Sequence, residues 1–81
     1  MAKVLFPTDW QQYTGGVESA EVGATNYRDL VAELSRRFPG LTDDIITRHA
    51  MAINGAVIPK PMLETFETHA DLVFFGWIQG G

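Results

Sequence analysis

The sequence predicts an α+β fold in which a sheet of four to five strands packs on one main helix. Three observations support this fold class: one amphipathic helical stripe, several short β-branched or aromatic segments between turn residues, and one Asn-Gly dipeptide. A single helix cannot cover both faces of a sheet, so we expect one open face. With 81 residues and 46% apolar content, residues 1–81 are expected to form a single domain.

The segment before the helix predicts two strands joined by a turn. Residues 3–8 (KVLFPT) favour a first strand that its proline ends. Residues 9–16 (DWQQYTGG) are polar and close on two glycines, so they predict a turn. Residues 17–24 alternate weakly between apolar and polar, which indicates a second strand.

The main helix is expected to begin after Thr25 or Asn26, either of which is a suitable N-cap. Pro39-Gly40 ends it. The charged residues lie off the apolar stripe, and Glu33 precedes Arg37 by four positions, in the order that favours an ion pair. The stripe that should face the sheet consists of residues three and four positions apart: Tyr27, Leu30, Val31, Leu34 and Phe38.

Residues 41–48 are short and rich in polar side chains, and we expect one irregular turn there. Residues 49–53 (HAMAI) predict a third strand. Asn54-Gly55 is the strongest hairpin signal in the chain, and residues 56–58 form its return strand. Residues 62–70 are expected to be connecting chain.

Residues 71–78 (DLVFFGWI) predict the last strand, which should be central because it is the longest and most apolar. Its side chains alternate, so Leu72, Phe74 and Ile78 share one side. The other side carries Val73, Phe75 and Trp77, and we expect Phe75 and Trp77 on the open face, as anchors for a partner. The competing expectation is that residues 9–16 or 59–70 cover this side and bury it.

Composition excludes several function classes. The chain has no cysteine, so it forms neither disulfides nor thiolate metal sites, which fits a cytoplasmic protein. The net charge is −4 with no basic stripe, which disfavours nucleic acid as a partner. Neither glycine-rich phosphate motif occurs, so we expect no cofactor on this chain, and no apolar run reaches membrane-spanning length.

The titratable residues point to no catalytic or metal site. His49 and His69 are twenty positions apart, without metal-ligand spacing, so we expect no metal. Asp9, Asp43 and Asp44 lie in turn-like segments, where aspartate commonly forms local hydrogen bonds. Lys3 and Lys60 are interpreted as solvated surface charges. A small catalyst is therefore the least favoured class.

The element order and several motifs resemble a family of small sulfur carriers, the MoaD/ThiS-type ubiquitin-like proteins, over essentially the whole chain. The motifs are KVLF near the start, GAT to RFPGL over residues 23–41, ING at 53–55, and D-x-V-x-F before a closing Gly80-Gly81. Chain length makes the small subunit of molybdopterin synthase the nearest member. The resemblance implies a β-grasp fold with a mixed sheet and a flexible C-terminal tail over residues 79–81.

The resemblance also implies the chemistry. In this family the C-terminal carboxylate, here that of Gly81, is adenylated by a ubiquitin-activating-like enzyme that uses ATP, and it then becomes a thiocarboxylate. That sulfur serves molybdopterin (molybdenum cofactor) biosynthesis on the synthase large subunit, so the chain would be a co-substrate and not an enzyme. Gln79 and Gly80 would thread into the enclosed active site, where glycine tolerates close approach. Phe75, Trp77 and Ile78 would contact the partner.

One departure from the family pattern leaves alternatives open. Molybdopterin-type carriers commonly have one or two prolines before the final aliphatic-x-Gly-Gly, whereas residues 76–79 here read GWIQ. A carrier for another pathway (thiamine, cysteine or tRNA thiolation) therefore competes with the molybdopterin assignment. A different class, a β-grasp interaction domain without carrier chemistry, is distinguished by whether a free Gly81 carboxylate is required.

Overall fold

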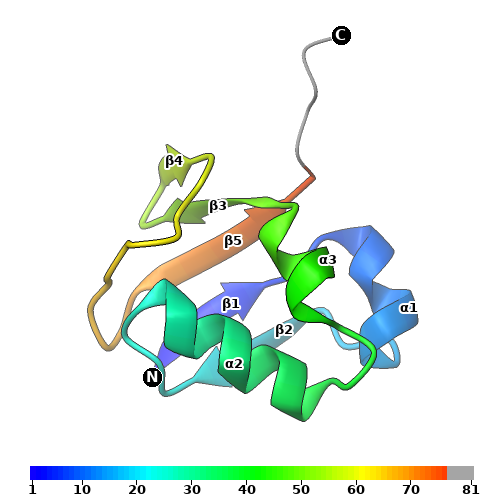
Figure 1. Ribbon diagram of the computed structural model, residues 1–81. Coiled ribbons are helices and arrows are strands. Elements are labelled where there is room, and N and C mark those ends of the chain that lie inside the picture. Colours follow the sequence, from blue (N-terminus) through cyan, green and yellow to red (C-terminus); the bar gives the residue numbers. More distant parts are fainter. Residues whose placement is uncertain (77–81) are drawn as a thin grey trace, which may run out of the picture.

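Five strands, three α-helices and one 3₁₀ helix make up residues 1–76, the part of the chain that the computed structural model describes (Figure 1). In chain order they are β1 (Ala2–Leu5), η1 (Thr8–Trp10), α1 (Gln11–Thr14), β2 (Ser19–Val22), α2 (Tyr27–Arg37), α3 (Asp43–Thr47), β3 (Ala50–Ile53), β4 (Ala56–Ile58) and β5 (Asp71–Phe75).

The strands form one mixed sheet in the order β2-β1-β5-β3-β4, so the last strand is central, as the sequence predicts. β5 pairs parallel with β1 and antiparallel with β3, while β1–β2 and β3–β4 are antiparallel. Parallel pairing of β1 and β5 requires a long connection, and the residues between them include the helices and the other three strands. The fold class is the expected α+β arrangement of a five-stranded sheet and one main helix.

Helix α2 begins at the predicted cap. The Oδ1 atom of Asn26 accepts a hydrogen bond from the backbone N–H of Asp29 at 2.8 Å, and Arg36 and Arg37 lie in the last turn. Those charges suit the negative end of the helix dipole. The predicted stripe faces the sheet: four of its residues are buried, and Phe38 packs partly buried against the core. The largest buried side chains include Trp10, Phe74, Leu30, Leu34, Leu41, Ile46, Met51 and Leu72.

The predicted turn over residues 9–16 is wrong. This segment forms the 3₁₀ helix η1 and the short helix α1, and Gly15 and Gly16 end them with φ of 68° and 90°. Trp10 is fully buried and packs on Phe74 with ring centroids 4.9 Å apart. The segment therefore covers the same side of the sheet as α2. A lone tryptophan among polar residues gives no periodic pattern, which is why the sequence alone misses this.

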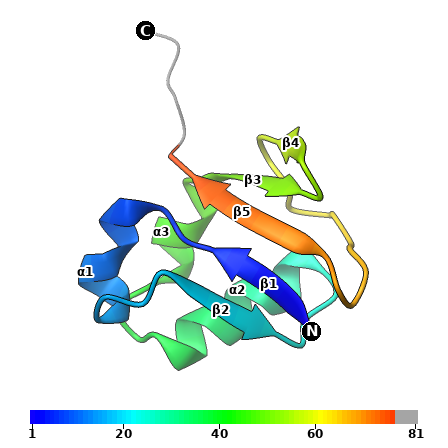
Figure 2. The ribbon, with the colours of Figure 1, turned by 180° about the vertical axis from the view of Figure 1, so that it is seen from behind.

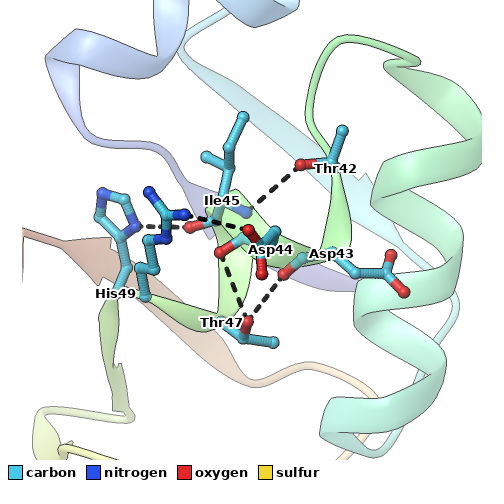
Figure 3. Close-up of polar contacts among 7 residues, drawn as sticks. Thr42, Asp43, Asp44, Ile45, Thr47 and His49 are labelled. Atoms are coloured by element: carbon cyan, nitrogen blue, oxygen red, sulfur yellow. Dashed lines mark hydrogen bonds and ion pairs between the residues drawn. The ribbon is translucent and has the colours of Figure 1, made fainter.

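The expected irregular turn at residues 41–48 is also a helix, α3 (Figure 3). Thr42 caps it: its Oγ1 accepts a hydrogen bond from the Ile45 N–H at 3.4 Å. At the other end the Thr47 hydroxyl donates to the Asp43 carbonyl at 2.8 Å. Ile46 is buried, so the short helix adds apolar area to the core, and Leu41 just before its N-cap is buried as well.

The Asn54-Gly55 hairpin is confirmed. Asn54 and Gly55 have φ of 50° and 86°, and these positive values are those of the two central residues of a type I′ turn. The segment that follows β4 forms one isolated bridge, between Asn26 and Thr65. It is tied to the start of α2, because the Tyr27 N–H donates to the Glu64 carbonyl at 3.0 Å. Within residues 1–76, no helix has the length and apolar character needed to cross a membrane.

Candidate functional site

The sheet face opposite α2 is open, and its residues come from all five strands (Figure 2). Buried residues of β1 and β5 (Val4, Leu72, Phe74) point toward the helices, so their neighbours point away. Strand register then places the outward residues side by side. Leu5 lies opposite Val73, Val73 lies opposite Ala52, and Ala52 lies opposite Val57.

These residues form an apolar row across β1, β5, β3 and β4. We call this row, together with Phe75, the sheet patch: Leu5, Val73, Ala52, Val57 and Phe75. Leu5 and Val57, at the two ends of the row, are 44% and 61% exposed, Val73 and Phe75 are half-buried, and the small Ala52 between Val73 and Val57 is buried. Apolar side chains that stay exposed in a contiguous group mark a surface suited to a partner.

One end of the sheet patch is charged. Lys3 lies between Glu21 on β2 and Asp71 on β5 in the strand register. A shallow hollow of about 350 Å³ adjoins it, lined in part by Lys3, Leu5 and Val73. A partner that covers the sheet patch would therefore also meet one cation and two carboxylates.

β5 ends at Phe75, three residues before the predicted end of the last strand, and the predicted tail over residues 79–81 lies outside the described residues. Gly76 follows the strand, is exposed, and has no atom within 4 Å of the position that a Cβ would occupy. The predicted site residues Trp77, Ile78, Gln79, Gly80 and Gly81 lie outside the described residues. Phe75 is the predicted site residue that the structure does describe. It lies on the open face, half-buried and paired with Ala50.

An aromatic cluster that the sequence does not predict packs against the end of β5, on the side of the sheet that the helices cover. Phe74 packs on Trp10, and the Trp10 indole N–H donates to Nε2 of His49 at 3.1 Å. Since Nε2 accepts, Nδ1 carries the proton, and it donates to the Ile45 carbonyl at 2.8 Å (Figure 3). Both imidazole nitrogens are thus engaged, and His49 has a structural role.

The other end of β5 is fixed by the hairpin turn. The Asn54 N–H donates to the Asp71 carbonyl at 2.8 Å, and the Asn54 side chain accepts from the Asp71 N–H at 2.9 Å. With Trp10 and His49 at one end and Asn54 at the other, the central strand is held at both ends. The strand can therefore serve as a rigid base for the segment that follows it.

Within the described residues, the remaining titratable side chains form no cluster suited to catalysis or metal binding. Nδ1 of His69 lies 3.2 Å from the Met1 amino group. Asp44 pairs with Arg48 at 3.0 Å on the surface of α3, and Asp43 lies in the first turn of that helix. Lys3 and Lys60 are exposed. Across residues 1–76, no three His, Cys, Asp or Glu side chains come close enough together to hold a metal.

Two sets of residues escaped the sequence-based prediction. Leu5 and Val57 belong to the sheet patch, and the alternation along Lys3, Val4 and Leu5 is the sequence signal that places Leu5 on the outward side. Trp10 and His49 come from segments 39 positions apart, and no local pattern joins them.

Comparison with known proteins identifies the fold. No family model matches the sequence, and a search of curated proteins finds no significant match. Among solved structures, the chain is similar to SAMP1 from Haloferax volcanii, with a TM-score of 0.63 and 19% sequence identity. The match covers 99% of this chain and 98% of that one. The α+β architecture is thus a ubiquitin-like β-grasp fold.

Proposed function

We propose that this chain is a sulfur carrier in which the carboxylate of Gly81 is the reactive group. The observation that carries the proposal is the course of β5, the central strand of a β-grasp sheet. It crosses a partly exposed apolar row on the open face and leads into a sequence that closes on Gly80-Gly81. The sheet patch would bind a partner, and the tail would deliver its end group to that partner's active site.

The proposed reaction has three steps on the carrier. A Gly81 carboxylate oxygen attacks the α-phosphorus of ATP, which releases pyrophosphate and leaves an acyl-adenylate. The terminal sulfur of a donor persulfide then adds to the carbonyl carbon and AMP leaves, which gives an acyl disulfide. A second thiolate attacks the donor sulfur of that acyl disulfide, forms a disulfide with the donor, and releases the thiocarboxylate on Gly81. Glycine favours the first two steps because no side chain shields the carbonyl. ATP would be bound by a ubiquitin-activating-like adenylating enzyme, and this chain would be a co-substrate.

The preferred acceptor is the molybdopterin precursor held by the large subunit of molybdopterin synthase. Transfer of the sulfur to it, with water supplying an oxygen, would return Gly81 to a carboxylate. The support for this acceptor is the length of the chain, while the KVLF, ING and D-x-V-x-F motifs support the carrier family as a whole. Residues 76–79 lack the usual proline, so carriers for thiamine, cysteine or tRNA thiolation remain the alternative acceptor systems.

The test is ATP–pyrophosphate exchange by adenylating enzymes from the same source, with the chain as co-substrate. We expect exchange with the unaltered chain and none with a variant that carries one additional residue after Gly81. The extended variant keeps the sheet patch, so it should still bind the enzyme. No exchange with either chain despite tight binding would favour a β-grasp interaction domain, whose sheet patch suffices without the tail.

A further inference from the structure

The face opposite the sheet patch carries its own apolar feature, on the side of α2 and α3 (Figure 1). A hollow of about 490 Å³ lies there, lined by Val31 and Ala32 of α2, Asp43 of α3, and the loop residues Met62 and Leu63, with Arg28 at α2. We call it the helix-side groove. It takes no part in the proposed carrier chemistry.

Leu63 projects beside this groove. Its side chain is 95% exposed, and that of its neighbour Met62 is 54% exposed. Both sit in a turn closed by a hydrogen bond from the Glu64 N–H to the Pro61 carbonyl at 3.0 Å. The Glu64 carbonyl in turn accepts from the Tyr27 N–H at 3.0 Å, which ties the turn to the start of α2. These two hydrogen bonds fix the backbone around Leu63, so its side chain stays exposed to solvent.

The groove also has opposite charges on its lining. Arg28 and Asp43 are both exposed, and neither takes part in the ion pairs found within residues 1–76. A hollow with a projecting apolar side chain on its lining, together with one charge of each sign, forms a self-complementary surface. In a two-fold dimer every contact occurs twice, so the projection of each copy can enter the hollow of the other.

We propose that the helix-side groove binds a second copy of this chain. Leu63 of each copy enters the groove of its partner, and Arg28 of each copy faces the partner's Asp43. A small apolar ligand would contact Leu63 on the lining of the groove but would leave Asp43 without a cation, so it accounts for fewer of these features. The contact is small, so the dimer is expected to be weak, with dissociation in the micromolar to millimolar range.

This arrangement leaves the sheet patch uncovered, because it uses the opposite side of the molecule (Figure 2). A carrier could then meet its partner enzyme as a monomer or as a dimer. The proposal is independent of the carrier chemistry, and its failure would leave the reaction proposed for Gly81 untouched.

Sedimentation velocity of the full chain, from about 10 μM to about 1 mM, tests the proposal. We expect the sedimentation coefficient to rise with concentration. Leu63→Asp should weaken association by at least about tenfold, because each dimer loses two buried leucines. Val57→Asp is the matched control: it adds the same charge at an exposed apolar position on the opposite face, and it should leave association unchanged.

A charge exchange tests the orientation. Arg28→Glu should weaken association through repulsion from the partner's Asp43, and Arg28→Glu combined with Asp43→Lys should restore it. Monomeric behaviour at every concentration would overturn the proposal. So would association that Leu63→Asp leaves intact, equal losses from Leu63→Asp and Val57→Asp, or a double variant as weak as the single one.

Discussion

Trp10 links the core to the end of the central strand through a single polar contact. Its indole is fully buried, and its N–H has His49 as acceptor at 3.1 Å. A buried donor that loses its partner costs free energy, because water cannot replace the lost hydrogen bond. The imidazole therefore specifies where Trp10, and with it Phe74, lies beneath the end of β5.

We predict that His49→Phe lowers the free energy of unfolding by about 1–3 kcal/mol. The phenyl ring keeps an aromatic neighbour 4.9 Å from Trp10 but offers no nitrogen to accept the N–H. Urea denaturation measures the loss. His69→Phe, at an exposed position, is the control and should change stability by less than about 0.5 kcal/mol. Equal stabilities for the two variants would mean that the Trp10–His49 bond contributes nothing.

Unlike the Trp10 N–H, the Tyr27 hydroxyl has no hydrogen-bond partner within the described residues, and it is buried. Burial raises the pKa of Tyr27 above its ordinary value of 10.0, because the phenolate would lose its solvation. The folded chain therefore holds this proton more tightly than the unfolded chain does. Its contribution to stability is complete below pH 10 and is lost as the pH rises through the folded-state pKa.

Tyr27→Phe removes both the unpaired buried hydroxyl and its ionisation at high pH. At neutral pH we expect stability to stay unchanged or to rise by up to about 1 kcal/mol, since an unpaired polar atom leaves the core. Above pH 10 the unaltered chain should lose stability more steeply than the variant. Melting temperatures from pH 8 to pH 11 test this, and parallel curves for the two proteins would contradict the burial of the hydroxyl.

Some helices and turns can be predicted from neighbouring residues alone, and others cannot. The stripe of α2 and the Asn54-Gly55 turn each have a self-contained pattern, so the sequence predicts them to within a residue or two. Helices α1 and α3 have four and five residues, too few for a helical period to emerge. Their formation depends on tertiary burial of Trp10 and Ile46, and no window of neighbouring residues contains that information.

The hairpin supplies the sharpest test at this scale. Gly55 has φ of 86°, so Gly55→Ala should lower the free energy of unfolding by about 1–2 kcal/mol. Gly23→Ala is the matched control, because a Cβ there would meet no atom within 4 Å and its φ is not in the left-handed region. Thermal melting compares them. If both variants melted together, conformational strain at Gly55 would be ruled out as a determinant of the hairpin.

The whole molecule divides into a covered and an uncovered side of the sheet. The sequence predicts this division, because one helix cannot cover two faces, and alternation along β5 places Phe75 on the open side. It does not predict that Leu5 and Val57 align with Val73, since that alignment depends on pairing between strands distant in sequence. The sequence thus predicts the part of the candidate site that lies on β5, and the pairing of the strands in the structure adds the residues of β1, β3 and β4.

We predict that the sheet patch, and not the helix-side groove, binds the adenylating enzyme. Val57→Asp should weaken that binding by at least about tenfold, since a charge would be placed inside an apolar contact, with the melting temperature little changed. Leu63→Asp should leave the binding unchanged. Titration calorimetry compares the variants, and the reverse order of effects would assign the enzyme to the helix side.

The central claim is that Gly81 carries sulfur, and the intact mass of the chain tests it most directly. The protein is incubated with ATP, a sulfur donor and an adenylating enzyme from the same source, and its C-terminal peptide is then fragmented. We predict the mass gain of one oxygen replaced by one sulfur, confined to Gly81. An unchanged mass with enzymes that bind the chain tightly would contradict the claim and leave a β-grasp protein that acts through its surface alone.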